Sequence, residues 1–110
     1  MSVQRGDVYW VSLNPVKGHE QEGFRPVLVL TPDVFNKLTN MPVVLPITTH
    51  DNFARRRGFS VALYGCKTQG IVRCDQPRAI DLEARNGKYI ETLPTDIVKE
   101  VLARVRTLFE

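Results

Sequence analysis

The sequence is poor in the residues that build covalent or metal-bound frameworks. It has two cysteines, Cys66 and Cys74, and two histidines, His19 and His50, among 110 residues. These four residues do not have the spacing of a zinc site, and two cysteines cannot form the disulfide framework of a small secreted domain. We therefore expect free thiols in a reducing cytoplasm, with neither a metal nor a cofactor.

Long apolar runs are also absent. A helix that crosses a bilayer needs roughly 20 consecutive apolar residues, and the chain has no such stretch. Residues 1–6 lack the apolar core of a signal peptide, and a glycine-rich phosphate loop and a serine nucleophile elbow are missing as well. The length of 110 residues suits one domain, 1–110, that folds on its own core. These absences leave a soluble cytoplasmic domain with no membrane partner.

Positive charge is concentrated in one part of the chain. Residues 50–75 hold five cationic and two anionic side chains, which accounts for the whole net charge of +3. The polar loop 49–59 combines arginines with two phenylalanines, a mixture that suits single-stranded nucleic acid because guanidinium groups pair with phosphates and rings stack on bases. Phe53, Arg55 and Arg57 are therefore candidate RNA contacts, and binding should weaken with salt. The alternative is a solvated basic loop with buried rings.

The hydrophobic pattern predicts several short strands followed by one closing helix. Thr95 is expected to cap this helix, and apolar residues recur at three- and four-residue spacing from there to Phe109. A short helical segment is expected at 33–38, and polar loops at 16–24 and 49–58. This order indicates a mainly β (α+β) fold, a small and strongly bent antiparallel sheet or barrel. The expected strands are 7–13, 27–30, 43–48, 59–63, 70–75, 78–82 and 88–93.

Arg73 and Asp75 are the first candidates for chemistry. They stand two residues apart on a predicted strand, so both side chains should project from one face while Val72 and Cys74 point into the core. A cation and a carboxylate held on a stiff element can act as an acid–base or charge-stabilising unit. The alternative is a surface ion pair that contributes about 0–1 kcal/mol.

His19 is a second candidate for chemistry. It lies in a loop between Gly18 and Gly23. A histidine in such a loop titrates near neutral pH and can contact a substrate phosphate. The alternative is a histidine that is simply solvated.

Several segments together resemble the PemK/Kid branch of the MazF toxin family. The resemblance runs nearly from end to end, and its most specific part is Gly18-His19-Glu20-Gln21, followed by Arg25-Pro26 and by Arg73-Cys74-Asp75-Gln76-Pro77-Arg78. It implies a small SH3-like barrel of the CcdB/MazF type with a C-terminal helix, assembled as a homodimer. It also implies the toxin of a type II toxin–antitoxin system, which cleaves single-stranded RNA, including mRNA, without metal and so inhibits translation and growth. A cognate antitoxin protein would hold it inactive, and operator DNA would be contacted only through that antitoxin.

The resemblance also assigns roles to particular residues. It places Arg73 and Asp75 in catalysis, with His19 as a supporting catalytic residue. Arg57 stands where the branch usually has a small residue and Gln69 where it has threonine, so the cleavage sequence is open, with a UA-containing site as the default expectation. The residues implied for the base-binding surface are Thr48, Thr49, Phe59, Gln69 and Ile71.

The chemistry of metal-free RNA cleavage gives each catalytic residue an expected task. The neighbouring 2′-OH is the nucleophile, so the site needs a base, positive charge at the phosphorus and an acid for the 5′-oxygen. Asp75 is the expected base. The resemblance leaves open whether Arg73 or His19 is the general acid, since some schemes for the family give this role to the arginine. Arg73 is better suited to clamp the phosphate, because a guanidinium group does not readily give up its proton. His19 would supply the proton or add charge, and the products would be a 2′,3′-cyclic phosphate and a 5′-OH.

Two other functions fit the same fold. A CcdB-like DNA gyrase poison is the first, but that activity is associated with a C-terminal Trp-Gly-Ile tail, whereas this chain ends Thr107-Leu108-Phe109-Glu110. The second is a non-catalytic RNA-binding barrel, which would bind RNA and leave it intact.

Overall fold

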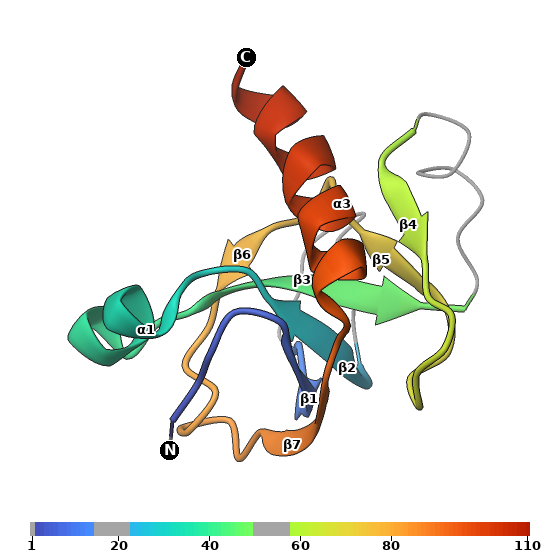
Figure 1. Ribbon diagram of the computed structural model, residues 1–110. Coiled ribbons are helices and arrows are strands. Elements are labelled where there is room, and N and C mark those ends of the chain that lie inside the picture. Colours follow the sequence, from blue (N-terminus) through green and yellow to red (C-terminus); the bar gives the residue numbers. More distant parts are fainter. Residues whose placement is uncertain (1, 15–22, 50–57) are drawn as a thin grey trace.

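A strongly bent antiparallel sheet forms the body of the protein (Figure 1). The structure is a computed structural model that describes residues 2–14, 23–49 and 58–110. Four of the predicted site residues, His19, Phe53, Arg55 and Arg57, therefore lie outside the described part. Within the described residues the strands are β1 (Asp7–Ser12), β2 (Phe24–Val29), β3 (Val43–Thr48), β4 (Ser60–Ala62), β5 (Ile71–Arg73), β6 (Arg78–Ala79) and β7 (Lys88–Thr92).

Two helices and a final 3-10 turn accompany the described strands. Helix α1 (Asp33–Thr39) connects β2 to β3, and helix α3 (Thr95–Arg106) follows β7 and continues into the 3-10 turn η1 (Thr107–Phe109). None of the helices in the described part is long and apolar enough to cross a membrane.

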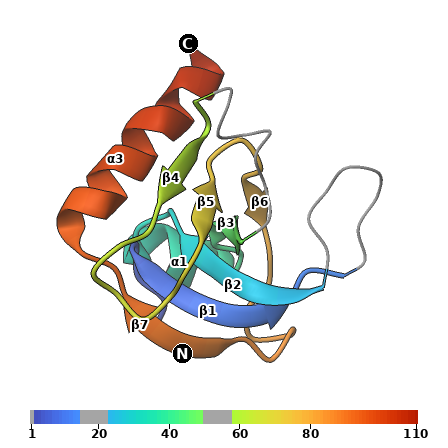
Figure 2. The same ribbon diagram turned by 90° about the vertical axis from the view of Figure 1, so that its right-hand side faces the viewer.

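The strands run in the order β4-β5-β3-β2-β1-β7, with β6 also paired to β3. Strand β3 is shared between two parts of the sheet. Its residues Val44 to Pro46 pair with β2, whereas Ile47 and Thr48 pair with β5. Because β3 serves both neighbours, the short β4–β5 pair is turned away from the β1–β2 pair, as Figure 2 shows.

Side-chain alternation gives the sheet a core on each face. Residues of β1 to β5 on one face pack beneath α3, which contributes Ile97, Val98, Val101 and Val105 (Figure 2). The opposite face buries a second cluster: Tyr9, Val11, Leu13, Val27, Val29, Val44, Ile80 and Leu82. The C-terminal periodicity therefore predicted the buried face of α3 correctly, since apolar residues three and four positions apart lie on one side of a helix.

Some boundaries differ from the expectation. Strand β2 begins at Phe24 rather than residue 27, because β1 extends the pairing as far as Ser12 opposite Phe24. Thr95 does not cap α3; it is the first residue of the helix, and Pro94 precedes it with an extended backbone and no side-chain cap bond. The expected strand 78–82 is only two residues long. It ends there because a turn begins at Asp81, whose carboxylate accepts a hydrogen bond from the Ala84 N–H at 2.9 Å.

Candidate active site

Arg73 and Asp75 meet on the face of the sheet that is turned away from α3. The Arg73 Nε donates to Asp75 Oδ1 and the Nη2 donates to Oδ2, both at 2.9 Å. Strand β5 ends at Arg73, earlier than the expected strand 70–75, so Asp75 lies in the turn that follows. Val72 and Cys74 are nevertheless fully buried in the core beneath α3, as expected. The side chains of Arg73 and Asp75 are 6% and 23% exposed, so the pair is not the freely solvated surface ion pair of the alternative interpretation.

The backbone around the pair is fixed by neighbouring strands. Val72 pairs with Ile47 of β3 on one side and with Val61 of β4 on the other. After β5 ends, the Cys74 N–H still donates to the carbonyl of Phe59 at 2.8 Å, so the pairing with the chain before β4 reaches the residue next to Asp75. A bidentate guanidinium–carboxylate pair on such a support has one defined orientation, which a preorganised site requires.

Two of the predicted RNA-contact residues, Thr48 and Ile71, lie together at this face. Ile71 is directly opposite Thr48, and Gln69 is exposed two positions before Ile71. Thr49 is exposed at the end of β3, and Phe59 is half-buried just before β4. The structure thus places all five predicted base-binding residues of the described part on β3, β4, β5 or the segments that join them.

Ser60 is a residue that the sequence did not single out. It lies directly opposite Arg73 in the β4–β5 pair, on the face that carries the ion pair, and its side chain is half-buried. A lone serine has no motif around it, and only the register between β4 and β5 reveals its position. Its hydroxyl adds a hydrogen-bond donor and acceptor to the site.

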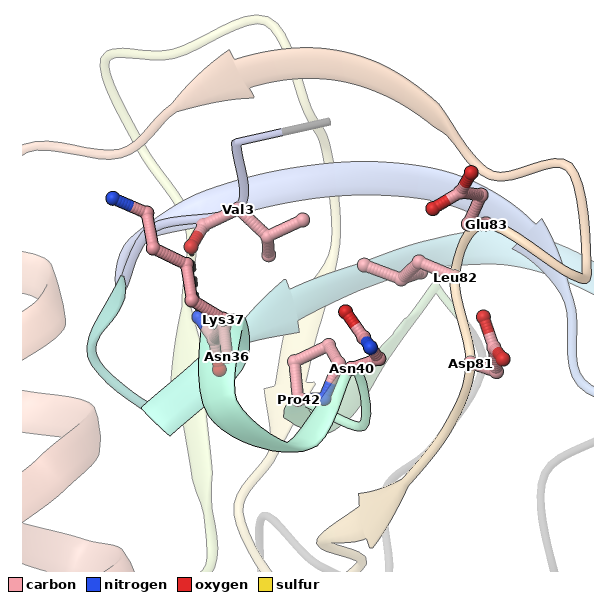
Figure 3. Close-up of a pocket in the computed structure, with 8 residues that line it drawn as sticks. All are labelled: Val3, Asn36, Lys37, Asn40, Pro42, Asp81, Leu82 and Glu83. Atoms are coloured by element: carbon pink, nitrogen blue, oxygen red, sulfur yellow. Dashed lines mark hydrogen bonds between the residues drawn. The ribbon is translucent and has the colours of Figure 1, made fainter. Parts of the chain in front are cut away.

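Two other observations concern the rest of the described residues. Among residues 2–14, 23–49 and 58–110, no group of three His, Cys, Asp or Glu side chains is placed to hold a metal ion. A cavity of about 140 Å³ lies between α1, Val3 and the turn at 81–83, and none of the predicted site residues lines it (Figure 3). In the described part, the partly buried ion pair of Arg73, at the end of β5, with Asp75 has the strongest case for chemistry.

The two cysteines are expected to differ sharply in reactivity. Burial raises the pKa of the Cys74 thiol to about 12, while Cys66 is half-exposed and its pKa is raised less far, by burial and by Glu91. Since the thiolate is the reactive form, a disulfide reagent at pH 8 should modify Cys66 slowly and leave Cys74 intact until the protein is unfolded. Peptide mapping before and after guanidinium treatment measures this. The folded Cys66→Ser variant should react almost not at all with the reagent. Equal labelling of both thiols in the folded native protein would contradict the prediction.

The bent sheet and the closing helix agree with the fold of a known class of small toxins. The chain belongs to the PemK-like, MazF-like toxins of type II toxin–antitoxin systems, whose family model matches residues 4–109. It is 53% identical over 108 residues to the endoribonuclease PemK of Escherichia coli, covering 96% of this chain and 81% of that protein. It is also 43% identical over 111 residues to the endoribonuclease toxin ChpB of Escherichia coli K12, covering 97% and 94% of the two chains.

Solved structures agree with this membership. The crystal structure of MazF from Deinococcus radiodurans superposes with a TM-score of 0.88 at 28% identity, covering 99% of this chain and 97% of that one. A MazE–MazF structure from the same organism gives 0.82 at 29% identity, with 99% and 96% covered. The predicted fold class, mainly β with a C-terminal helix, is confirmed.

Proposed function

We propose that this protein is the toxin of a type II toxin–antitoxin pair and that it cleaves single-stranded RNA, including mRNA, at short sequences without a metal ion. The observation that carries the proposal is the bidentate pair of Arg73, the last residue of β5, with Asp75 in the turn after it, at the face to which Thr48 and Ile71 also belong. The relatives PemK and ChpB, both named endoribonucleases, support it, and they favour this activity over the gyrase poison and the RNA-binding barrel.

In the proposed reaction the ribose 2′-OH attacks the adjacent phosphorus. Asp75 takes the 2′ proton, a bond forms between the 2′-oxygen and phosphorus, and the bond from phosphorus to the 5′-oxygen breaks. The partly exposed Asp75 carboxylate can be reached from solvent, whereas Arg73 behind it supplies a fixed positive charge for the phosphorane. His19 would give the leaving 5′-oxygen its proton, so the products are a 2′,3′-cyclic phosphate and a 5′-OH.

RNA recognition and partners complete the proposal. The bases of the RNA would be contacted by Thr48, Thr49, Phe59, Gln69 and Ile71. The RNA chain would also be contacted by Phe53, Arg55 and Arg57. The default target is a UA-containing sequence. Complexes of MazE with MazF support a cognate antitoxin as partner. We further propose a cytoplasmic homodimer that contacts operator DNA only through its antitoxin.

Cleavage of a long defined RNA by the purified protein in EDTA tests the proposal. We expect cuts at one short sequence, with 5′-OH and cyclic phosphate ends, and with a rate that falls as salt rises because phosphate contacts release counterions. Cuts that leave 5′-phosphate ends would contradict the 2′-OH route. Intact RNA across diverse sequences would overturn the ribonuclease, and a parallel DNA gyrase supercoiling assay would then test the gyrase poison.

A further inference from the structure

Residues 63–70 connect β4 to β5. One carboxylate attaches this segment to β7, the strand at the opposite end of the sheet. Glu91 of β7 accepts hydrogen bonds from the N–H groups of Lys67 and Thr68 at 3.1 and 2.7 Å, and from the Thr68 hydroxyl at 2.5 Å. Strands β4 and β7 are the two ends of the strand order, so Glu91 links opposite ends of the bent sheet. Figure 2 shows the β4–β5 connection descending to β7.

The charge on Glu91 makes this link strong. Burial alone would raise the pKa of Glu91, but the Thr68 hydroxyl and the two N–H groups lower it by more, so that the net shift is downward. The carboxylate is therefore ionised at neutral pH while it accepts all three bonds. Hydrogen bonds to a charged acceptor are about twice as strong as neutral ones. Thr68 itself is buried, and its two bonds to Glu91 are partly buried, which reduces competition with water at these two bonds.

The other end of the segment is fixed beside Thr48, at the face of the sheet that holds the proposed RNA site. Gly70 has a φ of +121°, and a Cβ at this position would lie 2.6 Å from the carbonyl oxygen of Thr48. The Gly70 carbonyl in turn accepts a hydrogen bond from the Leu63 N–H at 3.0 Å. Gln69 is thus the single residue between two fixed points, Thr68 at Glu91 and Gly70 at Thr48.

We infer that Glu91 is a positioning residue for RNA recognition, acting through Lys67 and Thr68 to hold Gln69 and Ile71 where they meet the bases. The inference rests on the proposed function. Glu91 lies on β7 and its carboxylate faces the backbone of the segment, so its effect on RNA is indirect. Loss of the link should therefore alter which sequences are bound and leave the reaction at Arg73 and Asp75 nearly intact.

The test compares Glu91→Gln with the native protein on RNAs that carry the preferred sequence or single-base variants of it. The amide keeps the size of the side chain but loses the charge and one acceptor oxygen. We expect KM for the preferred RNA to rise about tenfold, the preference over single-base variants to fall about tenfold, and kcat to change less than threefold, as fits the loss of hydrogen bonds to a charged group. Amide exchange at Lys67 and Thr68 should accelerate in the same variant.

Two further variants make the test specific. Thr68→Val removes the hydroxyl and keeps the N–H group, so it should move KM and preference in the same direction by a smaller factor. Glu83→Gln changes an exposed carboxylate on the turn after β6 and should behave as the native protein does. A Glu91→Gln variant with accelerated amide exchange but native preference would overturn the positioning role, as would a uniform loss of kcat that follows the loss of folded protein.

The native protein in the same assay separates this inference from the proposed function. If the native protein cleaves no RNA, the proposed function fails and the inference fails with it. If the native protein cleaves at one sequence and Glu91→Gln cleaves with the same preference, only the inference fails.

Discussion

Replacing Asp75 with asparagine is expected to lower the rate of RNA cleavage by about 10²–10⁴-fold, the usual contribution of a general base. Asparagine keeps the size of the side chain and one acceptor for Arg73, but it cannot take the 2′ proton. Alanine would also leave the nearly buried guanidinium without this carboxylate, so asparagine separates chemistry from folding more cleanly. The measurement is the single-turnover rate on an RNA with one preferred site.

The matched control is Asp33→Asn, which changes a carboxylate in the first turn of α1. Its rate should equal that of the native protein. RNA that cannot react, with a 2′-deoxyribose at the cleavage position, should bind the Asp75→Asn protein within about tenfold of the native affinity, since the lost step is proton transfer and not recognition. Native cleavage rates in Asp75→Asn would remove Asp75 from the mechanism.

Replacing Arg73 with lysine is expected to lower kcat by about 10²–10³-fold, comparable to the loss of one preorganised donor at a developing negative charge. Lysine keeps the positive charge, but a single ammonium cannot reproduce the planar pair of donors that Nε and Nη2 now direct at Asp75. The lysine variant therefore tests whether the reaction needs only a positive charge at this position or a positive charge with two planar donors.

The measurement is kcat and KM on the same RNA, with thermal unfolding to confirm that the variant is folded. Arg25→Lys, on β2, provides a control for a general arginine-to-lysine effect. A native kcat in Arg73→Lys would show that positive charge alone suffices and that the two-donor pairing with Asp75 is not needed for the reaction.

Much of the site's support was predictable because it depends on local rules. Alternation along residues 71–75 placed Arg73 and Asp75 on one face and Val72 and Cys74 in the core, and the structure agrees. The apolar spacing after Thr95 predicted α3 in the same way. In each case a short stretch of sequence determines which face a side chain occupies.

The remaining features depend on contacts between distant parts of the chain. Ser60 reaches Arg73 only through the register of two three-residue strands, and Glu91 reaches Thr68 across 23 positions. The local sequence around a serine or a glutamate is the same whether its side chain faces solvent or forms a hydrogen bond with a distant residue. The bend that brings the ends of the sheet together comes from many small twists, and no single segment of the sequence carries its signature.

The packing of α3 on the sheet also affects when the chain can complete its fold. Val72 and Cys74, the neighbours of the proposed catalytic pair, are buried in a core to which α3 contributes four side chains. Ribosomes make this helix after every strand described here, and domains generally fold as units. A chain still attached to its ribosome therefore holds its reactive strand without the support that orders it. On the proposed function, we expect RNA cleavage to require that α3 has been made and has docked on this core.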